Sequence, residues 1–281
     1  MKRLKSLEEV ANQYDAVFCD VWGVLHNGLE AFPEAVSALQ RIRSFGVAVI
    51  LLTNSPRLSA SVIEQISHLG VPNTAYDKVV TSGEVTRELI KAGPRRIYHI
   101  GTEPQLMIYA GIDVELVEEG ADVIVCTGLR DETIETPADY TELLERFSKA
   151  DIPLICANPD IQIHRGNRLE WCAGAIARDY EAMGGTTLIA GKPHYPIYEA
   201  AHTKAEGVLG QKLEKSRILA IGDGLLTDVK GASGYGLDVL FIADGVHCAE
   251  YAKDGVIHLQ KMRDFIHKQG QKAVAYMEVL S

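Results

Sequence analysis

The sequence lacks any apolar run of the length that a membrane span needs, about twenty consecutive apolar residues. Its first fifteen residues turn acidic and polar before any apolar stretch of the kind found in a secretory signal. It also lacks the low-complexity stretches that mark a flexible linker. We therefore expect a globular protein of the cytoplasm with no membrane partner.

Positive charge is scarce in this chain. Its 281 residues include 28 Lys and Arg against 38 Asp and Glu, and only KAGPRR at 91–96 is locally basic. Nucleic-acid binding depends on clustered Lys and Arg, so the formal charge of −10 argues against a nucleic-acid partner. The five cysteines show neither the paired spacing of a zinc site nor a disulfide framework. We expect them to be buried thiols.

Short apolar runs alternate with helix-like segments along the chain. Residues 16–22 (AVFCDVW) and 47–55 (VAVILLTNS) predict buried strands, and 33–46 and 59–70 have helical spacing. Further strands are predicted at 78–82, 96–102, 122–128, 153–158, 186–191, 217–223 and 238–244, and further helices at 138–150 and 196–210. This alternation is typical of α/β proteins, in which helices cover a parallel sheet.

Polar side chains follow four of these predicted strands, at the point where each apolar run ends. They are Asp20, Thr53 with Asn54, Lys192 and Asp223. In open α/β sheets, ligands bind outside the carboxyl ends of the strands. Two carboxylates, a hydroxyl with an amide, and an ammonium form a coherent set for phosphoryl transfer. Each residue alone is equally well explained as a turn former or a helix cap.

The order of these motifs carries more information than any one of them. DVWGVL at 20–25, TN at 53–54, GKP at 191–193 and GDGLLTD at 222–228 resemble the four ordered motifs of the haloacid dehalogenase (HAD) superfamily. The long interval between the second and third motifs has an α/β pattern of its own, which predicts an inserted cap domain.

Segments late in this interval and at its end narrow the resemblance further. ANPD at 157–160, CAGA at 172–175 and GKPHYPIYEAA at 191–201 are similar to subclass IIA, the NagD-like proteins with a large α/β cap. The resemblance implies a Rossmann-like parallel-sheet core and an inserted α/β cap. The predicted core domain comprises residues 1–82 and 186–281, and the predicted cap domain comprises residues 83–185.

The resemblance also implies a magnesium-dependent phosphatase that acts on a small phosphorylated metabolite. Asp20 would attack phosphorus and form an aspartyl-phosphate, while Lys192 would neutralise charge on Asp20 and on the phosphoryl oxygens. Phosphate and substrate contacts are expected from Thr53, Asn54, Ser55 and Asn158, with Asp160, His164 and Arg165 as further candidates in the cap. The open alternatives are a helix-capping turn at 53–55 and a polar loop at 158–165. A homodimer is compatible with the sequence.

The metal ligands implied by the resemblance are Asp20, the backbone carbonyl of Trp22, Asp223 and Asp228. Magnesium prefers oxygen ligands and keeps several of its waters, so this set suffices. Asp228 either belongs to the metal site, directly or through water, or caps the helix that follows it.

Trp22 departs from the family pattern, because phosphatases of the superfamily usually carry there an aspartate that acts as general acid and then base. Losing such a group typically costs about a hundredfold to ten-thousandfold in rate. His26, on the same loop, either supplies the proton or makes a loop contact. Trp22 either lines the pocket or packs in the core. The second hypothesis is therefore a catalytically impaired phosphate-binding or regulatory protein of HAD fold.

Overall fold

The structure, a computed structural model, describes residues 1–165 and 168–281, without the side chains of residues 164, 165 and 168. The chain divides into two compact units. The first comprises Met1–Thr53, Ile63–Val80 and Tyr198–Ser281, and the second comprises Asn54–Val62 and Thr81–Ile197. The predicted boundary at 82/83 lies close to the transition after Val80, whereas the predicted boundary at 185/186 lies twelve residues before the transition after Ile197. The domain boundaries remain a prediction.

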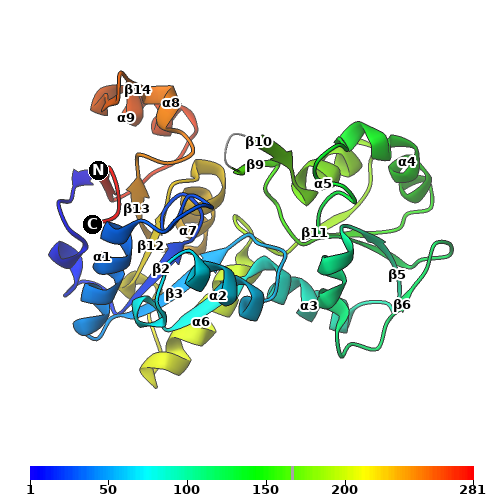
Figure 1. Ribbon diagram of the computed structural model, residues 1–281, viewed down its shortest axis with the longest axis horizontal. Coiled ribbons are helices and arrows are strands. Elements are labelled where there is room, and N and C mark those ends of the chain that lie inside the picture. Colours follow the sequence, from blue (N-terminus) through cyan, green and yellow to red (C-terminus); the bar gives the residue numbers. More distant parts are fainter. Residues whose placement is uncertain (166–167) are drawn as a thin grey trace. The chain divides into compact units, whose positions relative to one another are not determined.

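The first unit is built on a seven-stranded sheet of order β1-β16-β13-β12-β2-β3-β4 (Figure 1). Its strands are β1 (Lys2–Arg3), β2 (Ala16–Asp20), β3 (Ala48–Thr53), β4 (Lys78–Thr81), β12 (Ile218–Gly222), β13 (Asp238–Ile242) and β16 (Ala275–Met277). The chain builds outward from β2 to β4, returns to the other side of β2 with β12, and continues to β16. The order therefore reverses between β2 and β12, which pair in parallel. Such a switch point is where open α/β sheets bind their ligands.

Buried apolar runs form the centre of this sheet. Every residue of β2, β3 and β12 is buried, as expected of parallel strands that are covered on both faces. Helix α1 turns Ala35, Leu39 and Ile42 inward at helical spacing. The helices of this unit are α1 (Pro33–Ser44), α7 (Lys230–Tyr235), α8 (Cys248–Tyr251), α9 (Leu259–Lys268), most of α6 (Tyr195–Leu209) and the second half of α2 (Ser59–His68). The first and last strands, β1 and β16, pair in parallel, so the two termini lie together (Figure 1).

The second unit has its own five-stranded parallel sheet, of order β11-β8-β7-β5-β6 (Figure 1). Alternate residues of β7 enter two different hydrophobic clusters: Ile124 packs in one, and Val123 and Val125 pack in the other. Both faces are therefore buried, which explains the continuous apolar run VIVC. The strands of the second unit are β5 (Arg96–Ile100), β6 (Glu115–Leu116), β7 (Val123–Cys126), β8 (Leu154–Cys156) and β11 (Thr187–Ile189), with a separate hairpin of β9 (Gln162–Arg165) and β10 (Arg168–Trp171). Its helices include α3 (Ser82–Ala92), α4 (Thr141–Lys149) and α5 (Ala173–Ala182).

The predicted α/β class with parallel sheets is confirmed, and all nine strand predictions fall on strands. The segment 138–150 divides into a 3-10 turn, Pro137–Tyr140, and helix α4. The sequence reasoning missed β16 and the β9–β10 hairpin. β16 has only three residues, and the hairpin carries charged and polar residues among its apolar ones. The described helices are all too short or too polar to cross a lipid bilayer.

The first unit should depend on the packing of its central strands. Ile50, in the middle of β3, is fully buried, so Ile50→Ala is expected to lower the free energy of unfolding by about 2–5 kcal/mol through lost transfer energy and a residual cavity. The same truncation at Ile134, which is 78% exposed, should change it by less than about 0.5 kcal/mol. Urea unfolding of both variants, followed by circular dichroism, measures the difference. Equal effects would contradict this account of the core.

Candidate active site

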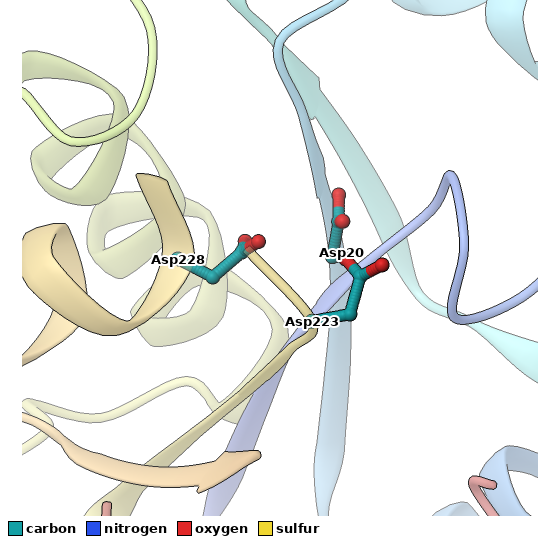
Figure 2. Close-up of side chains that lie close together, drawn as sticks. All are labelled: Asp20, Asp223 and Asp228. Atoms are coloured by element: carbon teal, nitrogen blue, oxygen red, sulfur yellow. The ribbon is translucent and has the colours of Figure 1, made fainter. Parts of the chain in front are cut away.

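Three buried carboxylates meet at the switch point of the first unit. Asp20 ends β2, Asp223 directly follows β12, and Asp228 lies in the π-helical turn Leu225–Val229. One oxygen of each carboxylate lies within 4.8 Å of the others, and Figure 2 shows the three side chains close together. Their residues are only 8%, 5% and 5% exposed, respectively. Chain segments about two hundred residues apart thus supply one acidic cluster.

The carboxylate of Asp223 is held by backbone that approaches it closely. The Val246 N–H donates to its Oδ2 at 2.8 Å. A Cβ atom on Gly245 would lie 2.2 Å from the Cβ of Asp223, and one on Gly23 would lie 2.5 Å from its Oδ2. Gly23 also has a positive φ of 82°, which favours glycine. The sequence analysis missed both glycines, although Gly23 stands within the first motif and Gly245 follows a predicted strand.

Asp228 is held by the turn that contains it. Its Oδ2 accepts hydrogen bonds from the Gly224 N–H at 3.1 Å and from the Thr227 hydroxyl at 3.4 Å. A Cβ on Gly222 would lie 2.3 Å from the Asp228 side chain. Asp228 does not occupy the N-cap of α7, which is Val229; its carboxylate bonds backward to the N–H of Gly224, the N-cap of the turn that contains it.

The carboxylate cluster fits a hard divalent cation. All three side chains offer oxygen, and the group contains no His or Cys. Such a donor set suits magnesium better than metals that prefer nitrogen or sulfur ligands. Like charges this close and this buried repel one another, so a bound cation would stabilise all three carboxylates. The Trp22 carbonyl as a fourth protein ligand remains a prediction.

Trp22 packs against its own loop. Its indole makes an edge contact with the His26 ring, with ring centroids 5.1 Å apart, and a Cβ on Gly28 would lie 2.6 Å from the indole. His26 is 2% exposed, and its Nδ1 accepts the Gly28 N–H at 3.0 Å. Burial lowers the pKa of His26 to about 4, so the imidazole is neutral at neutral pH. The loop-contact alternative for His26 therefore explains it better than proton transfer does.

His247 is a further residue near the cluster that the sequence analysis did not single out. Its Nε2 accepts the Leu225 N–H at 3.2 Å, at the start of the turn that carries Asp228. Burial lowers the pKa of His247, while Glu250 and Asp228 raise it, and the net direction is downward. The neutral ring therefore serves as a hydrogen-bond acceptor that helps to fix this turn.

Thr53, Asn54 and Ser55 have three different environments. Thr53 is buried at the end of β3, one residue beyond Leu52, which pairs in register with Asp20. The Asn54 amide lies in the second unit, where it bonds to Lys192 and to Asp160. Ser55 forms a turn: its Oγ accepts the N–H of Arg57 at 3.3 Å. The contacts of the Asn54 side chain with Lys192 and Asp160 account for its position without the helix-capping alternative.

Lys192 and Asn158 both belong to the second unit. Lys192 is 2% exposed. The Asn158 Oδ1 accepts the Asp160 N–H at 3.0 Å, which closes a turn after β8. Substrate contact by Asn158 remains a prediction, and the side chains of His164 and Arg165 lie outside the described residues. The predicted site residues thus divide into Asp20, Trp22, Thr53, Asp223 and Asp228 in the first unit and Asn54, Ser55, Asn158 and Lys192 in the second.

Comparison with known proteins relates this architecture to known hydrolases. A family model described as haloacid dehalogenase-like hydrolase matches residues 17–115, and a HAD-hydrolase-like model matches residues 189–264. A crystal structure of a hydrolase of the haloacid dehalogenase-like family from Brucella suis 1330 is 57% identical, with a TM-score of 0.88, over 99% of this chain and 100% of that one.

Two more distant structures extend the comparison. Glycerol phosphate phosphatase from Mycobacterium tuberculosis, solved in complex with calcium, is 25% identical, with a TM-score of 0.65, over 84% of this chain and 68% of that one. NagD from E. coli K-12 is 21% identical, with a TM-score of 0.69, over 95% of this chain and 97% of that one. A similarity at 21% identity shows the fold alone. The predicted resemblance to the NagD-like subclass is therefore confirmed for the fold.

Neutralising one member of the carboxylate cluster should stabilise the metal-free protein. Asp228→Asn removes one of three close charges while its amide oxygen can still accept the Gly224 N–H, so we expect the melting temperature in excess EDTA to rise by about 2–4 °C, equivalent to about 1 kcal/mol. Excess magnesium should then stabilise the wild type more than the variant. Differential scanning fluorimetry measures both shifts.

A matched control for this variant is Asp77→Asn. The Asp77 carboxylate bonds to Arg43 and accepts the Val49 N–H at 2.8 Å, so its neutralisation should lower the melting temperature with or without magnesium. A lower melting temperature for Asp228→Asn in EDTA would show that repulsion within the cluster is not the dominant effect.

Proposed function

Because the chain belongs to the haloacid dehalogenase-like hydrolases, we propose that it is a magnesium-dependent phosphatase acting on a small phosphorylated metabolite. The observation that carries the proposal is the buried cluster of Asp20, Asp223 and Asp228 at the switch point. The name of the Mycobacterium tuberculosis relative, a glycerol phosphate phosphatase, supports a phosphomonoester as the substrate class.

The three carboxylates would bind the metal, and Asp20 would also serve as the nucleophile. Asp20, Asp223, Asp228 and the Trp22 carbonyl are the proposed ligands, and magnesium, when bound, neutralises the negative charge of the carboxylates and the phosphoryl group. The hydrogen bonds from Val246 to Asp223 and from Gly224 to Asp228 fix the orientation of these two carboxylates. Such support keeps ligands in place before the substrate arrives.

Asp20 would attack phosphorus with one carboxylate oxygen. The bond from phosphorus to the leaving oxygen breaks, and an aspartyl-phosphate forms. Water then attacks that phosphorus, which releases phosphate and restores Asp20. The register of β2 and β3 supports a hydrogen bond from the Thr53 hydroxyl to the phosphoryl group, because Thr53 lies one residue past the partner of Asp20. The proposed role of Lys192 is to neutralise phosphoryl charge.

Proton transfer to the leaving group limits this mechanism. Trp22 has no acidic proton to give, and His26 is buried against Trp22 with its Nδ1 bonded to Gly28. A leaving oxygen that departs as a stable anion needs no acid, whereas an alkoxide does. We therefore propose that the enzyme hydrolyses aryl, enol or acyl phosphates faster than alkyl phosphates. The same observation is what favours the second candidate, a phosphate-binding protein without turnover.

The phosphatase proposal predicts magnesium-dependent phosphate release that requires Asp20. We expect wild type to release phosphate from p-nitrophenyl phosphate in magnesium but not in EDTA, and Asp20→Asn to lose at least about a thousandfold in kcat, since an amide cannot form the covalent intermediate. A malachite-green assay on a panel with glycerol, sugar and nucleoside phosphates extends the test. If wild type binds magnesium and phosphate but releases nothing from any ester, the binding-protein candidate is favoured instead.

Restoring an acid at position 22 should change the dependence on the leaving group. In wild type, log kcat/KM is expected to fall steeply as the pKa of the leaving alcohol rises; in Trp22→Asp the slope should become shallower, with a gain of about tenfold or more on alkyl phosphates. Trp22→Phe, which stays apolar and supplies no acid, is the control and should keep the steep slope. A shallow slope in wild type would mean that another group already donates the proton.

A further inference from the structure

The side chain of Asn54 has a role that the motif reading did not assign. We infer that Asn54, held by Asp160, is a positioning residue that fixes the backbone of Lys192. This inference rests on the proposed function only for the role of the Lys192 ammonium. The contacts that carry it all lie within the second unit.

The Asn54 side chain bonds both main-chain polar groups of Lys192. Its Oδ1 accepts the Lys192 N–H at 2.7 Å, and its Nδ2 donates to the Lys192 carbonyl at 3.2 Å. These residues are 138 positions apart in the chain. Both are buried, Asn54 to 5% and Lys192 to 2% exposure, so no solvent substitutes easily for a lost bond. The site of Lys192 is therefore fixed through its main chain.

Asp160 orients the amide of Asn54. The Nδ2 of Asn54 donates to the Asp160 Oδ1 at 2.9 Å, which determines which end of the amide faces each partner. Asp160 is itself held by Asn158, whose Oδ1 accepts the Asp160 N–H at 3.0 Å. The carboxylate of Asp160 thus accepts a hydrogen bond from the Asn54 amide, which also contacts Lys192. A chain of hydrogen bonds runs from Asn158 through Asp160 and Asn54 to Lys192.

Gly191 makes this arrangement possible. A Cβ at this position would lie 2.5 Å from the Asn54 Oδ1 and 2.7 Å from the Cδ of Pro159. Only a residue without a side chain allows the strand end before Lys192 to come this close. The close approach of Asn54 and Pro159 thereby accounts for a glycine at the first position of the GKP motif.

The position of Lys192 matters because its proposed role is to place the ammonium next to the negative charge of the phosphoryl group. Displacement of a catalytic group by about 1 Å can cost about a hundredfold in rate. The substrate can still bind through its other contacts, so loss of the Asn54 grip should lower kcat much more than it raises KM. A residue that merely stabilised the fold would lower the amount of active protein without this pattern.

The test is an exchange of the two side chains. In Asn54→Asp the donor to Asp160 is lost and two carboxylates face each other, so kcat on p-nitrophenyl phosphate is expected to fall about a hundredfold, with KM within about threefold of wild type. Asn73→Asp makes the same chemical change at an exposed position and is the matched control, expected within about threefold of wild type. Circular dichroism checks that each variant is folded.

The double variant N54D/D160N separates geometry from charge. Its Asn at 160 can donate to the Asp at 54, whose other oxygen can still accept the Lys192 N–H, so kcat should recover at least about tenfold over Asn54→Asp although the charge at position 54 remains. A double variant no better than Asn54→Asp, or Asn54→Asp with wild-type kcat, would overturn the inference while leaving the phosphatase proposal intact.

A second measurement does not depend on turnover. The Lys192 amide should be protected from hydrogen exchange in wild type and in Asp160→Asn, and Asn54→Ala should lower its protection about tenfold or more, because the acceptor is removed. If wild type released no phosphate from any ester, only the phosphatase proposal would fail. The hydrogen-exchange data would then decide whether the Asn54 contact holds Lys192. Unchanged protection in Asn54→Ala would overturn the inference.

Discussion

Repulsion among three buried carboxylates is the constraint on which the centre of the first unit depends. Asp20, Asp223 and Asp228 lie within 4.8 Å of one another, where each raises the electrostatic free energy of the other two. Backbone N–H groups offset part of this cost, and they reach the carboxylates because glycine lets the loops approach. Gly245 next to Asp223 and Gly222 next to Asp228 leave no space for a side chain. The loops are thus shaped by charge as much as by packing.

Strand order explains how these charges come together. β2 pairs with β3 on one side, and the chain returns to its other side with β12 only after the second unit is complete. Two loops leave adjacent strand ends in opposite directions at such a reversal, which opens room between them for a ligand. Within the second unit, β11 pairs with β8, and the segment that begins with Asn54 belongs to the same unit. The Asn54 amide can therefore bind the main chain of Lys192, 138 positions away. Topology therefore positions both the acids and the lysine.

The strands, which recur as apolar runs along the chain, were predictable from the sequence. Contacts between loops that are distant in the sequence were not. The strands were predictable because parallel strands buried on both faces give continuous apolar runs, as in AVILLT of β3. Asp20 and Asp223 were predictable because they end such runs. The packing of Trp22 on Gly28, the acceptor role of His247 and the side-chain contacts of Asn54 were not, since each joins loops whose distance only the folded chain defines. The backward hydrogen bond that the Asp228 carboxylate accepts from the Gly224 N–H was unpredictable for the same reason.

The cost of the acidic cluster bears on which of the two functions the chain performs. Most proteins can gain stability where a site strains the fold, and a chain that no longer uses such a site loses nothing by neutralising it. Here three carboxylates and the Lys192 ammonium belong to buried residues, and burial of a charged group carries a desolvation cost. Only position 22 lacks a group that hydrolysis of alkyl esters needs. Since an anionic leaving group that is already stable needs no proton, tryptophan there is compatible with a working nucleophile and restricts which esters it can cleave.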